Sequence, residues 1–542
     1  MSLWRNISGN WRETSFITIL LGIVWISLLR KIFDPDIWFH MVVGREVLRR
    51  MQVPDSEFYI YTRLGEPGEF HEWGFGAFYY LINQYSGHIG MAITNAAIGC
   101  GILLFLYLAA RGPNKTEWWI SLPVIGLVLW IVDLRLNFRP ETWLYLFLAI
   151  EIFLLEKYLQ HRLFLWLLPL PFLAWILSLG HPSALFLIGV FGIYALNAVL
   201  EETGSKLPLV VKFGGISLAM AAGAMLNPYG SKQLLLPLYF QGEELINSLT
   251  EDLPVLQTEY SLHFIVIAVV GLCALVFSPR RRLVDVILVG CFALLAFRYA
   301  RNISLLGIVL FVPIKNAFDV WSGHISKIVK PGLVMMFAAF VGITGIILTG
   351  TGPLWGSGIY QKHTPFNNAI LISKYVQTGN ILNFFHLGNY LAWELDRPVF
   401  VDGRNFGNNL SVRLHDAVFR ADSGWQNIIE QFDIKAIVSP VTLEFSGEII
   451  PLVEKLEVDP EWILIGQEES GLLFLKIPTQ EDIPRLSKSQ IWEQALEELN
   501  VTMENYPDSP ETYRSMSAAY RHLGNVAKQK YFLSKFNEKA NK

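Results

Sequence analysis

Residues 16–40 read FITILLGIVWISLLRKIFDPDIWFH, an apolar run followed at once by two aspartates. The run from Phe16 to Leu29 is preceded by Arg12, as in a signal sequence. No small-residue cleavage site follows it, so we predict an uncleaved membrane anchor. Asp34 and Asp36 then stand beside the bilayer, where a carboxylate is costly to hold. This cost marks the acidic cluster as a candidate functional site.

The composition excludes several classes of function. Of the 542 residues, 52% are hydrophobic and only 17% are charged, and the mean hydropathy is +0.38. These values are typical of a polytopic membrane protein rather than a soluble enzyme. A net charge of −4 gives no basic face for a nucleic-acid partner. Cys100, Cys273 and Cys291 lie in apolar runs, which indicates buried thiols rather than disulfides or metal ligands.

Runs of about twenty apolar residues, long enough to cross a hydrocarbon core of roughly 30 Å, predict about eleven transmembrane helices. They are residues 15–32, 88–110, 117–133, 141–158, 163–180, 183–200, 208–226, 262–278, 283–300, 303–318 and 332–350. The predicted fold is therefore mostly α and polytopic, with residues 1–350 as the transmembrane domain.

Basic residues in the short connections predict the orientation of these spans. Those on one side are Arg5, Arg12, Arg111, Lys115, Lys157, Arg162, Lys206, Arg280, Arg281, Arg282, Lys315, Lys327 and Lys330. The positive-inside rule makes this side the cytoplasm. We therefore predict a protein of the bacterial inner membrane, with a cytoplasmic N-terminus, an outward loop at 33–87 and an extracytoplasmic C-terminal domain.

Other basic residues lie at the outer ends of spans, against this bias. They are Arg30, Lys31, Arg45, Arg49, Arg50, Arg139, Arg298 and Arg301. Their position indicates that something anionic lies at that face. Within the outward loop, Ile37, Met41, Leu48 and Met51 recur near helical spacing, which predicts an interfacial amphipathic helix.

After Gly350 the sequence becomes mixed polar and predicts an α/β domain over residues 351–480. Helices are expected at 370–376, 387–395, 412–420, 425–432 and 448–456, and strands at 381–385, 399–401, 436–438, 462–467 and 472–477. Residues 485–542 resemble a single tetratricopeptide (TPR) helix pair. Three or more such repeats are normally needed to bury one face, so this tail is expected to dock on the preceding domain or on a protein partner.

Six motifs carry a resemblance to a known family. They are Asp36–His40, His71–Trp73, Arg139–Glu141, Asn227–Gly230, Arg301–Asn302 and Val399–Arg404. They carry a likeness to bacterial multi-span proteins of the GT-C superfamily with a TPR-like tail. The resemblance to the superfamily itself, a group of membrane glycosyltransferases, rests on Asp34-Pro35-Asp36 after the first span, the long outward loop with an interfacial helix, the many further spans and the outward C-terminal domain. That superfamily includes oligosaccharyltransferase catalytic subunits, protein O-mannosyltransferases and aminoarabinose transferases.

The resemblance implies transfer of a sugar from a polyprenyl-phosphate carrier to an acceptor at the outer face. The expected partners are a lipid-linked sugar donor and membrane lipid. Such a reaction needs a base for the acceptor's proton and cations for the departing phosphate. The predicted catalytic carboxylates are Asp34, Asp36 and Glu72. If a divalent metal ion is used, Asp34, Asp36 and His40 are its predicted ligands.

For the phosphate, Arg139, Arg298 and Arg301 are the candidates, because a guanidinium pairs with two phosphate oxygens and keeps its charge. The alternative for each is an arginine that only anchors a helix end. His40, His71 and His181 are predicted to bind substrate by hydrogen bonding. Glu141 is interpreted equally well as a salt-bridge partner of Arg139.

Two further motifs have simpler interpretations. Asn227–Gly230 reads as a turn that ends a helix at the outer surface. Asp402 and Arg404 follow a predicted strand, where ligands often bind. An ion pair within the domain is favoured over a ligand site for these two residues.

The main competing function is a non-catalytic membrane platform for envelope or secretion assembly, with residues 485–542 as its docking surface. A transporter is a third possibility. It would need repeated halves with interrupted helices and ionisable groups at mid-membrane, whereas here no repeat is found and the charges cluster at one surface.

Overall fold

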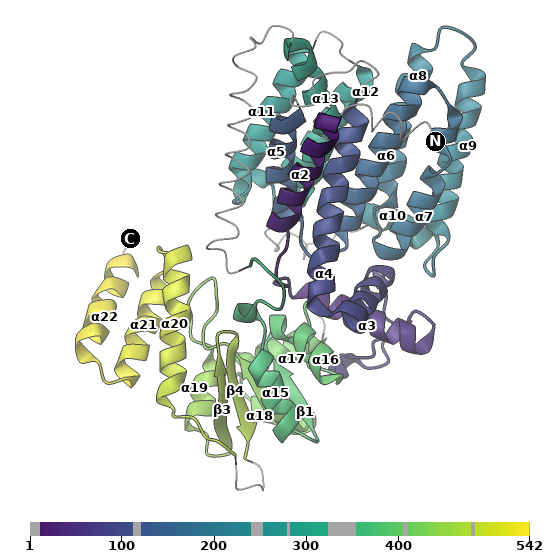
Figure 1. Cartoon of the computed structure of the whole chain (residues 1–542). Coiled ribbons are helices and arrows are strands. Elements are labelled where there is room, and N and C mark those ends of the chain that lie inside the picture. The colour runs from purple at the N-terminus through teal and green to yellow at the C-terminus, as the bar shows by residue number, and fades with distance from the viewer. Residues whose placement is uncertain are drawn as a thin grey trace. The chain divides into compact units, whose positions relative to one another are not determined.

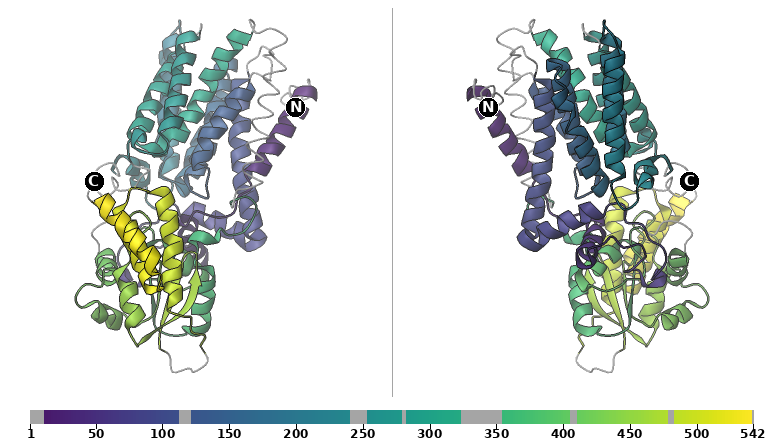
Figure 2. Two further views of the ribbon diagram at one scale, coloured as in Figure 1. Left: turned by 90° about the vertical axis from the view of Figure 1, so that its left-hand side faces the viewer. Right: turned by 90° about the vertical axis from the view of Figure 1, so that its right-hand side faces the viewer.

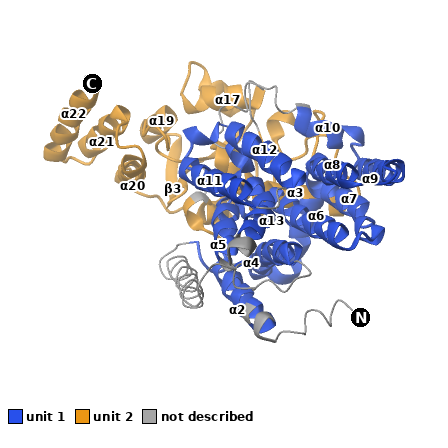
Figure 3. Cartoon of the chain, turned by 90° about the horizontal axis from the view of Figure 1, so that it is seen from above, with its two compact units in different colours: residues 1–34, 71–358 blue, residues 35–70, 359–542 orange. Residues whose placement is uncertain are grey.

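The computed structural model describes residues 11–111, 121–239, 253–278, 282–322, 354–404, 410–477 and 483–540. The chain folds into two compact units, shown in different colours in Figure 3. Unit 1 comprises Met1–Asp34 and His71–Gly358, and unit 2 comprises Pro35–Phe70 and Ile359–Lys542. The two aspartates of the opening motif therefore belong to different units.

Unit 1 is a bundle of helices that run side by side (Figures 1 and 2). Its elements are α2 (Trp11–Ser27), α4 (Trp73–Ala110), α5 (Ser121–Val132), η3 (Asp133–Arg135), α6 (Glu141–His161), η4 (Phe164–Leu167), α7 (Leu170–Gly180), α8 (Ala184–Glu201), α9 (Leu207–Met225), α10 (Ser231–Tyr239), η8 (Val255–Gln257), α11 (Ser261–Phe277), α12 (Leu283–Arg298), η9 (Ala300–Asn302) and α13 (Ile303–Ser322). Every predicted span from 15–32 to 303–318 overlaps one of these helices. The predicted span 332–350 lies outside the described residues.

Within the described residues, three helices are long and apolar enough to cross a membrane: α4, α8 and α9. The predicted total of about eleven crossings is not confirmed, because helices such as α11 are shorter than a full crossing requires. Helix α4 is broken at Gly87, where φ is 60° and ψ is −162°. This break lies one residue before the predicted span 88–110, so the segment Trp73–Ser86 is an additional helical stretch that the hydropathy did not predict.

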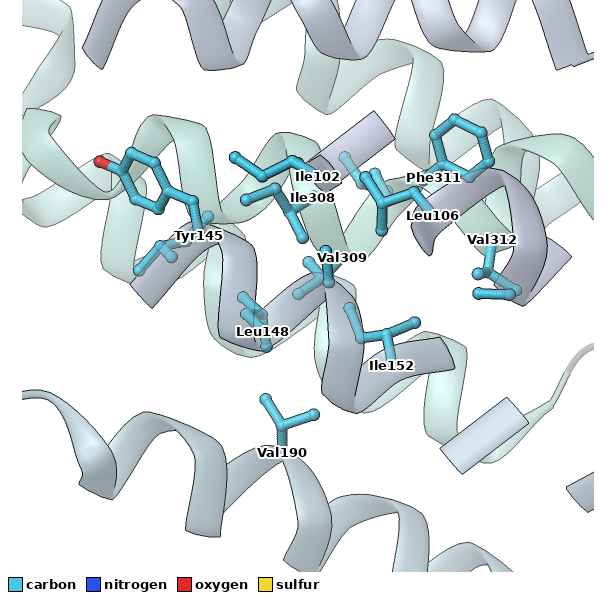
Figure 4. Close-up of a cluster of buried hydrophobic side chains, with 14 of the residues drawn as sticks. Ile102, Leu106, Tyr145, Leu148, Ile152, Val190, Ile308, Val309, Phe311 and Val312 are labelled. Carbon is cyan, nitrogen blue, oxygen red and sulfur yellow. The ribbon is translucent and has the colours of Figure 1, made fainter. Parts of the chain in front are cut away.

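Large aliphatic side chains fill the centre of unit 1. Figure 4 shows Ile102 of α4, Leu148 and Ile152 of α6, and Val309 of α13 within one cluster. Each of these side chains is at most 2% exposed. Because lipid is as apolar as leucine, close packing rather than exclusion of water stabilises contacts between helices in a bilayer.

Basic residues predicted to share one side of the membrane gather at one end of unit 1. Lys157 Nζ donates to Arg111 O at 3.1 Å and Lys315 Nζ donates to Ala110 O at 2.8 Å. Both lysines thus bind carbonyl groups at the C-terminal end of α4, where the helix dipole favours cations. Which side of the membrane this end faces stays a prediction.

Unit 2 contains a four-stranded sheet with the order β1-β2-β4-β3. The strands are β1 (Asn380–Asn383), β2 (Ile434–Ser439), β3 (Trp462–Glu468) and β4 (Gly471–Lys476). Strands β1 and β2 are parallel, and β4 is antiparallel to both β2 and β3. The helices are α3 (Asp36–Arg50), η1 (Tyr61–Arg63), η10 (Gln361–His363), α15 (Phe366–Tyr375), η11 (Phe385–Leu387), α16 (Gly388–Leu395), α17 (Leu410–Phe419), α18 (Trp425–Gln431) and α19 (Pro451–Val458). All the predicted helices and strands of this region overlap these elements except the strand at 399–401.

The segment 399–401 is buried but is not a strand of the sheet. Val399 forms an isolated parallel bridge with Ile60. Asn383 supplies the next polar contacts, because its side-chain oxygen accepts from Phe400 N at 3.0 Å and its amide donates to Val401 O at 2.9 Å. A distant loop and one side chain therefore satisfy this backbone in place of a neighbouring strand.

Helix α3 covers the predicted amphipathic segment, and its interfacial role stays a prediction. It belongs to unit 2 and packs against α16, with the rings of Trp38 and Tyr390 5.0 Å apart. Arg45 donates to Trp393 O at 3.0 Å, and Arg49 pairs with Asp396 at 2.7 Å. The anionic partner of these arginines is thus the C-terminal end of α16 within the protein.

The tail docks on the rest of unit 2. Its helices are α20 (Ser489–Asn505), α21 (Pro510–His522) and α22 (Val526–Ala540), drawn in yellow in Figure 2. Trp492 and Leu499 of α20 and Met516 of α21 share a hydrophobic cluster with Ile437 of β2. This contact confirms docking on the preceding domain. The likeness to a TPR repeat stays a prediction.

Glu498 fastens α20 to the sheet domain. Its carboxyl group accepts hydrogen bonds from Thr442 N at 2.7 Å and from Val441 N at 3.0 Å. Burial raises the pKa of Glu498 to about 7, although these two bonds oppose the rise. The docked carboxyl group therefore binds its proton more tightly than the same group does in an unfolded chain.

We predict that docking of α20 weakens as the pH rises. In the unfolded chain the pKa of a glutamate is roughly 4.3, so stability is lost as the pH climbs from there through about 7. Hydrogen exchange of the α20 amides, corrected for intrinsic rates, is expected to show more protection at low pH in the wild type. Glu498→Gln should flatten this dependence, and Glu497→Gln on the exposed face is the control. An unchanged pH dependence in Glu498→Gln would contradict the prediction.

Candidate active site

Charged side chains from several connections meet at one end of unit 1. Arg139 pairs with Asp34, and Arg135 pairs with Glu141 at 3.0 Å. Arg135, Arg139, His181 and Arg301 all act electrostatically on the Glu141 carboxylate. These residues come from the α2–α3 connection, from η3, from the η3–α6 connection, from the start of α6, from the α7–α8 connection and from η9. The cluster is thus built from parts of the chain that are far apart in sequence.

Asp34 and Arg139 form a buried ion pair. The side chain of Asp34 is 3% exposed and that of Arg139 is 24% exposed. A guanidinium held by a buried carboxylate has a fixed orientation, because moving it would leave the carboxylate without a counter-charge. The structure gives Glu141 a different partner from the one considered in the sequence, namely Arg135 in place of Arg139.

Two glycines bring His181 to Glu72. A Cβ on Gly74 would lie 2.6 Å from Leu179 O, and one on Gly180 would lie 2.5 Å from the ring of Trp143. Only hydrogen at both positions lets the end of α7 approach the starts of α4 and α6. As a result His181 Nε2 lies 3.6 Å from Glu72 Oε1.

His181 is held in its uncharged form. The pKa of His181 is lowered to about 4, mainly by burial, with Glu141 opposing the shift and Arg301 adding to it. At neutral pH its imidazole therefore offers one N–H donor and one nitrogen acceptor. It therefore takes part in the cluster as an uncharged group.

The Asn227–Gly230 turn supports His71. Asn227 Oδ1 accepts from Tyr229 N at 2.8 Å, which confirms the predicted turn. The ring of Tyr229 lies 4.6 Å from the ring of His71. Gln233 holds His71 by two further contacts. Its Oε1 lies 2.7 Å from His71 Nδ1, and its amide donates to His71 O at 2.9 Å. This motif fixes the residue that precedes Glu72.

Sequence reasoning missed Arg135, Ser183 and Gln233. Arg135 resembles an ordinary basic residue at a span end, and Gln233 lies in a short helix without a motif of its own. Ser183 stands two residues after His181, at the start of α8. The nearness of Ser183 to His181 was the only sequence signal for any of the three.

The structure places three other predicted residues elsewhere. Asp36 and His40 lie in α3 of unit 2. A Cβ on Gly403 would lie 3.3 Å from Asp36 Oδ1, so the Val399–Arg404 motif approaches this carboxylate. Arg298 is exposed at the end of α12 and stacks over the ring of Tyr299 at 4.7 Å.

The Asp402–Arg404 ion pair is confirmed inside unit 2. Arg404 Nε lies 2.7 Å from Asp402 Oδ2, and Arg404 Nη2 lies 3.0 Å from Glu57 Oε2. Tyr59 donates its hydroxyl hydrogen to Asp402. Burial raises the pKa of Tyr59, a shift that Arg404 opposes and Asp402 reinforces. These groups satisfy one another and hold the loop that approaches Asp36.

The predicted metal ligands were tested against the geometry. Within the residues that the structure describes, no group of three or more His, Cys, Asp or Glu side chains could hold a metal ion. Asp34 instead binds the guanidinium of Arg139. A three-ligand metal site at Asp34 is therefore not formed by the described side chains.

Comparison with known proteins gives a likeness of fold. No family model and no curated protein matches the chain. Among solved structures, the chain is similar to the Archaeoglobus fulgidus oligosaccharyltransferase crystallised with Zn and sulfate. The TM-score is 0.51 at 12% identity, over 90% of this chain and 76% of that one. The chain thus has a fold like that of this oligosaccharyltransferase, which supports the predicted fold class at that level only.

We predict that Asp34→Ala strongly destabilises unit 1, because it leaves the Arg139 guanidinium without its buried counter-charge. Breaking such a pair costs roughly 3–5 kcal/mol, whereas replacing both partners by apolar residues is often neutral. The double variant Asp34→Ala/Arg139→Leu should therefore regain most of the thermal midpoint measured in detergent.

The exposed pair Arg162–Glu201, with an N–O distance of 3.4 Å, is the control. Glu201→Ala should change stability by only about 0–1 kcal/mol. If Asp34→Ala behaves like Glu201→Ala, the buried pair does not have the role given to it here.

Proposed function

We propose that the chain is a membrane glycosyltransferase that moves a sugar from a polyprenyl-phosphate carrier to an acceptor at the outer face of the membrane. The observation that carries the proposal is the gathering of Arg135, Arg139, Arg301 and His181 around carboxylates at one end of an apolar bundle. A lipid phosphate presents its charge at such an end while its chain stays in the bilayer. The oligosaccharyltransferase-like fold agrees with this function.

In the proposed reaction, an acceptor atom attacks the anomeric carbon of the sugar while a base removes the acceptor's proton. The bond between the anomeric carbon and the phosphate oxygen breaks, and the carrier phosphate leaves with the bonding electrons. Arg139 and Arg301 neutralise the charge that develops on that phosphate. A single displacement of this kind inverts the anomeric centre.

We assign the carboxylates two roles, orienting an arginine and acting as the base. Asp34 is paired with Arg139, so we assign it the task of orienting that guanidinium towards the phosphate. Asp36 is our candidate for the base, with Glu72 as the second candidate. His71, held by Gln233, positions Glu72 through the backbone. His40 and Arg298 stay as predicted substrate contacts.

A platform function is the second candidate, and one observation favours it. Helix α22 has no buried side chain, and Val526 and Tyr531 are each 56% exposed. A helix with this much exposed apolar surface offers a docking face. The two proposals differ in whether glycans change when the carboxylates are neutralised.

The test of the transferase is Asp36→Asn, expressed in cells that lack the wild-type gene. Loss of a general base typically costs a factor of about 10²–10⁴ in rate, so the surface glycans should match those of the deletion strain by mass spectrometry. Arg139→Lys keeps the charge but loses the two-pronged contact with phosphate, and it should reduce product roughly tenfold.

Arg162→Lys, at an exposed ion pair far from the cluster in sequence, is the matched control and should leave the glycans unchanged. Identical glycans in the wild type, the deletion strain and Asp36→Asn would refute the transferase. Such a result, combined with loss of envelope assembly on deletion of residues 485–542, would favour the platform.

A further inference from the structure

Polar atoms around Glu72 are buried without a hydrogen-bond partner. They are Trp73 Nε1, His181 Nδ1 and Ser183 Oγ, none of which has a partner among the residues that the structure describes. Ser183 is only 2% exposed. Nearly all buried polar atoms in proteins are hydrogen-bonded, and leaving one unbonded costs free energy. Three such atoms, on residues at or next to the His181–Glu72 contact, therefore require an explanation.

These atoms belong to one place in unit 1. Trp73 follows Glu72, and the Glu72 carboxylate lies 3.6 Å from His181 Nε2. Ser183 is tied to His181 by a turn in which Ser183 N donates to His181 O at 2.9 Å. The contact of Gly74 with Leu179 O fixes the start of α4 against the end of α7. The three residues thus belong to the His181–Glu72 contact or adjoin it, Trp73 through the chain and Ser183 through the turn.

The donors and acceptors at this place suit hydroxyl groups. An indole N–H only donates, a serine hydroxyl both donates and accepts, and an uncharged imidazole does one of each. The Glu72 carboxylate disfavours a second anion here, so the phosphate belongs with the arginines around Glu141. A ligand with several neighbouring hydroxyls donates and accepts at every position, and the indole ring offers a flat apolar face to its C–H bonds.

We propose that Glu72, Trp73, His181 and Ser183 form a subsite that binds the hydroxyl groups of the donor sugar, separate from the arginines that bind its phosphate. This inference rests on the proposed function and deepens it. The subsite gives the protein affinity for the sugar itself, whereas Arg139 and Arg301 give affinity for any phosphorylated carrier. The two contributions are separable by experiment.

The test compares two ligands on the full-length protein in lipid nanodiscs. One ligand is bare polyprenyl phosphate, and the other is a panel of polyprenyl phosphates that carry glucose, mannose or N-acetylglucosamine. The wild type should bind at least one member of the panel more tightly than the bare carrier. Ser183→Ala should weaken that member roughly fivefold and leave the bare carrier unchanged. Arg139→Lys should weaken both ligands.

Ser178→Ala is the matched control, because Ser178 is also buried but its hydroxyl donates to Trp175 O at 2.7 Å. It should not alter the preference for the sugar. Ser183→Ala should not lower the thermal midpoint, since it breaks no hydrogen bond within the described residues. A lower midpoint together with unchanged binding would show a structural role and overturn the subsite.

The remaining outcomes separate the two proposals. If the wild type binds the bare carrier and every sugar-bearing carrier equally, or if Ser183→Ala weakens both kinds alike, the subsite is overturned while phosphate binding stands. If the wild type binds no carrier at all, the proposed transferase fails and the subsite fails with it.

Discussion

Charge compensation at the ends of an apolar bundle is the constraint on which unit 1 depends. Each carboxylate and each guanidinium there must find a counter-charge before the helices can pack. At one end, Arg282 satisfies Glu156 and Asp285 at 2.8 Å and 2.5 Å, and Tyr194 adds a hydrogen bond to Glu156. That network holds one cation between two carboxylates, and its charged groups satisfy one another.

The opposite end is organised differently. Three guanidinium groups, those of Arg135, Arg139 and Arg301, lie around Glu141, and His181 adds an uncharged imidazole. Pairing with Asp34 and Glu141 fixes the direction of two of these cations. A site that holds several oriented cations is prepared for an anion that arrives from outside, because the cost of ordering them has been met in folding. This asymmetry between the two ends is the structural reason for our proposal that a ligand binds at the Asp34 end.

The elements of the fold were largely predictable from the sequence, because hydropathy and periodicity are local. The helices α5 to α9 and the strands β2 to β4 all overlap their predicted ranges. Contacts over long sequence separations were not predictable in the same way. Periodicity showed an amphipathic α3 but could not show that α16 covers it, nor that Ile60 bridges to Val399.

The candidate site shows the same difference between local features, which were predictable, and long-range contacts, which were not. Residue type and position at span ends selected Asp34, Arg139, Glu72 and His181, and the structure brings these together in two pairs. The pairing itself was hidden, since Asp34 and Arg139 are 105 residues apart. The role of Gly180 was hidden in the sequence as well. In three dimensions its missing side chain is the reason why His181 reaches Glu72, since a Cβ would meet the Trp143 ring.

The two acidic motifs lie at the points in the sequence where the chain passes between the units. The chain passes from unit 1 to unit 2 between Asp34 and Pro35, and it returns between Phe70 and His71. Asp34–Asp36 and His71–Trp73 therefore lie at the two points where the loop 35–70 is joined to the bundle. Asp34 is held in unit 1 by Arg139, and Asp36 lies beside Gly403 in unit 2. Although only Pro35 separates the two aspartates, each of these contacts lies within the aspartate's own unit.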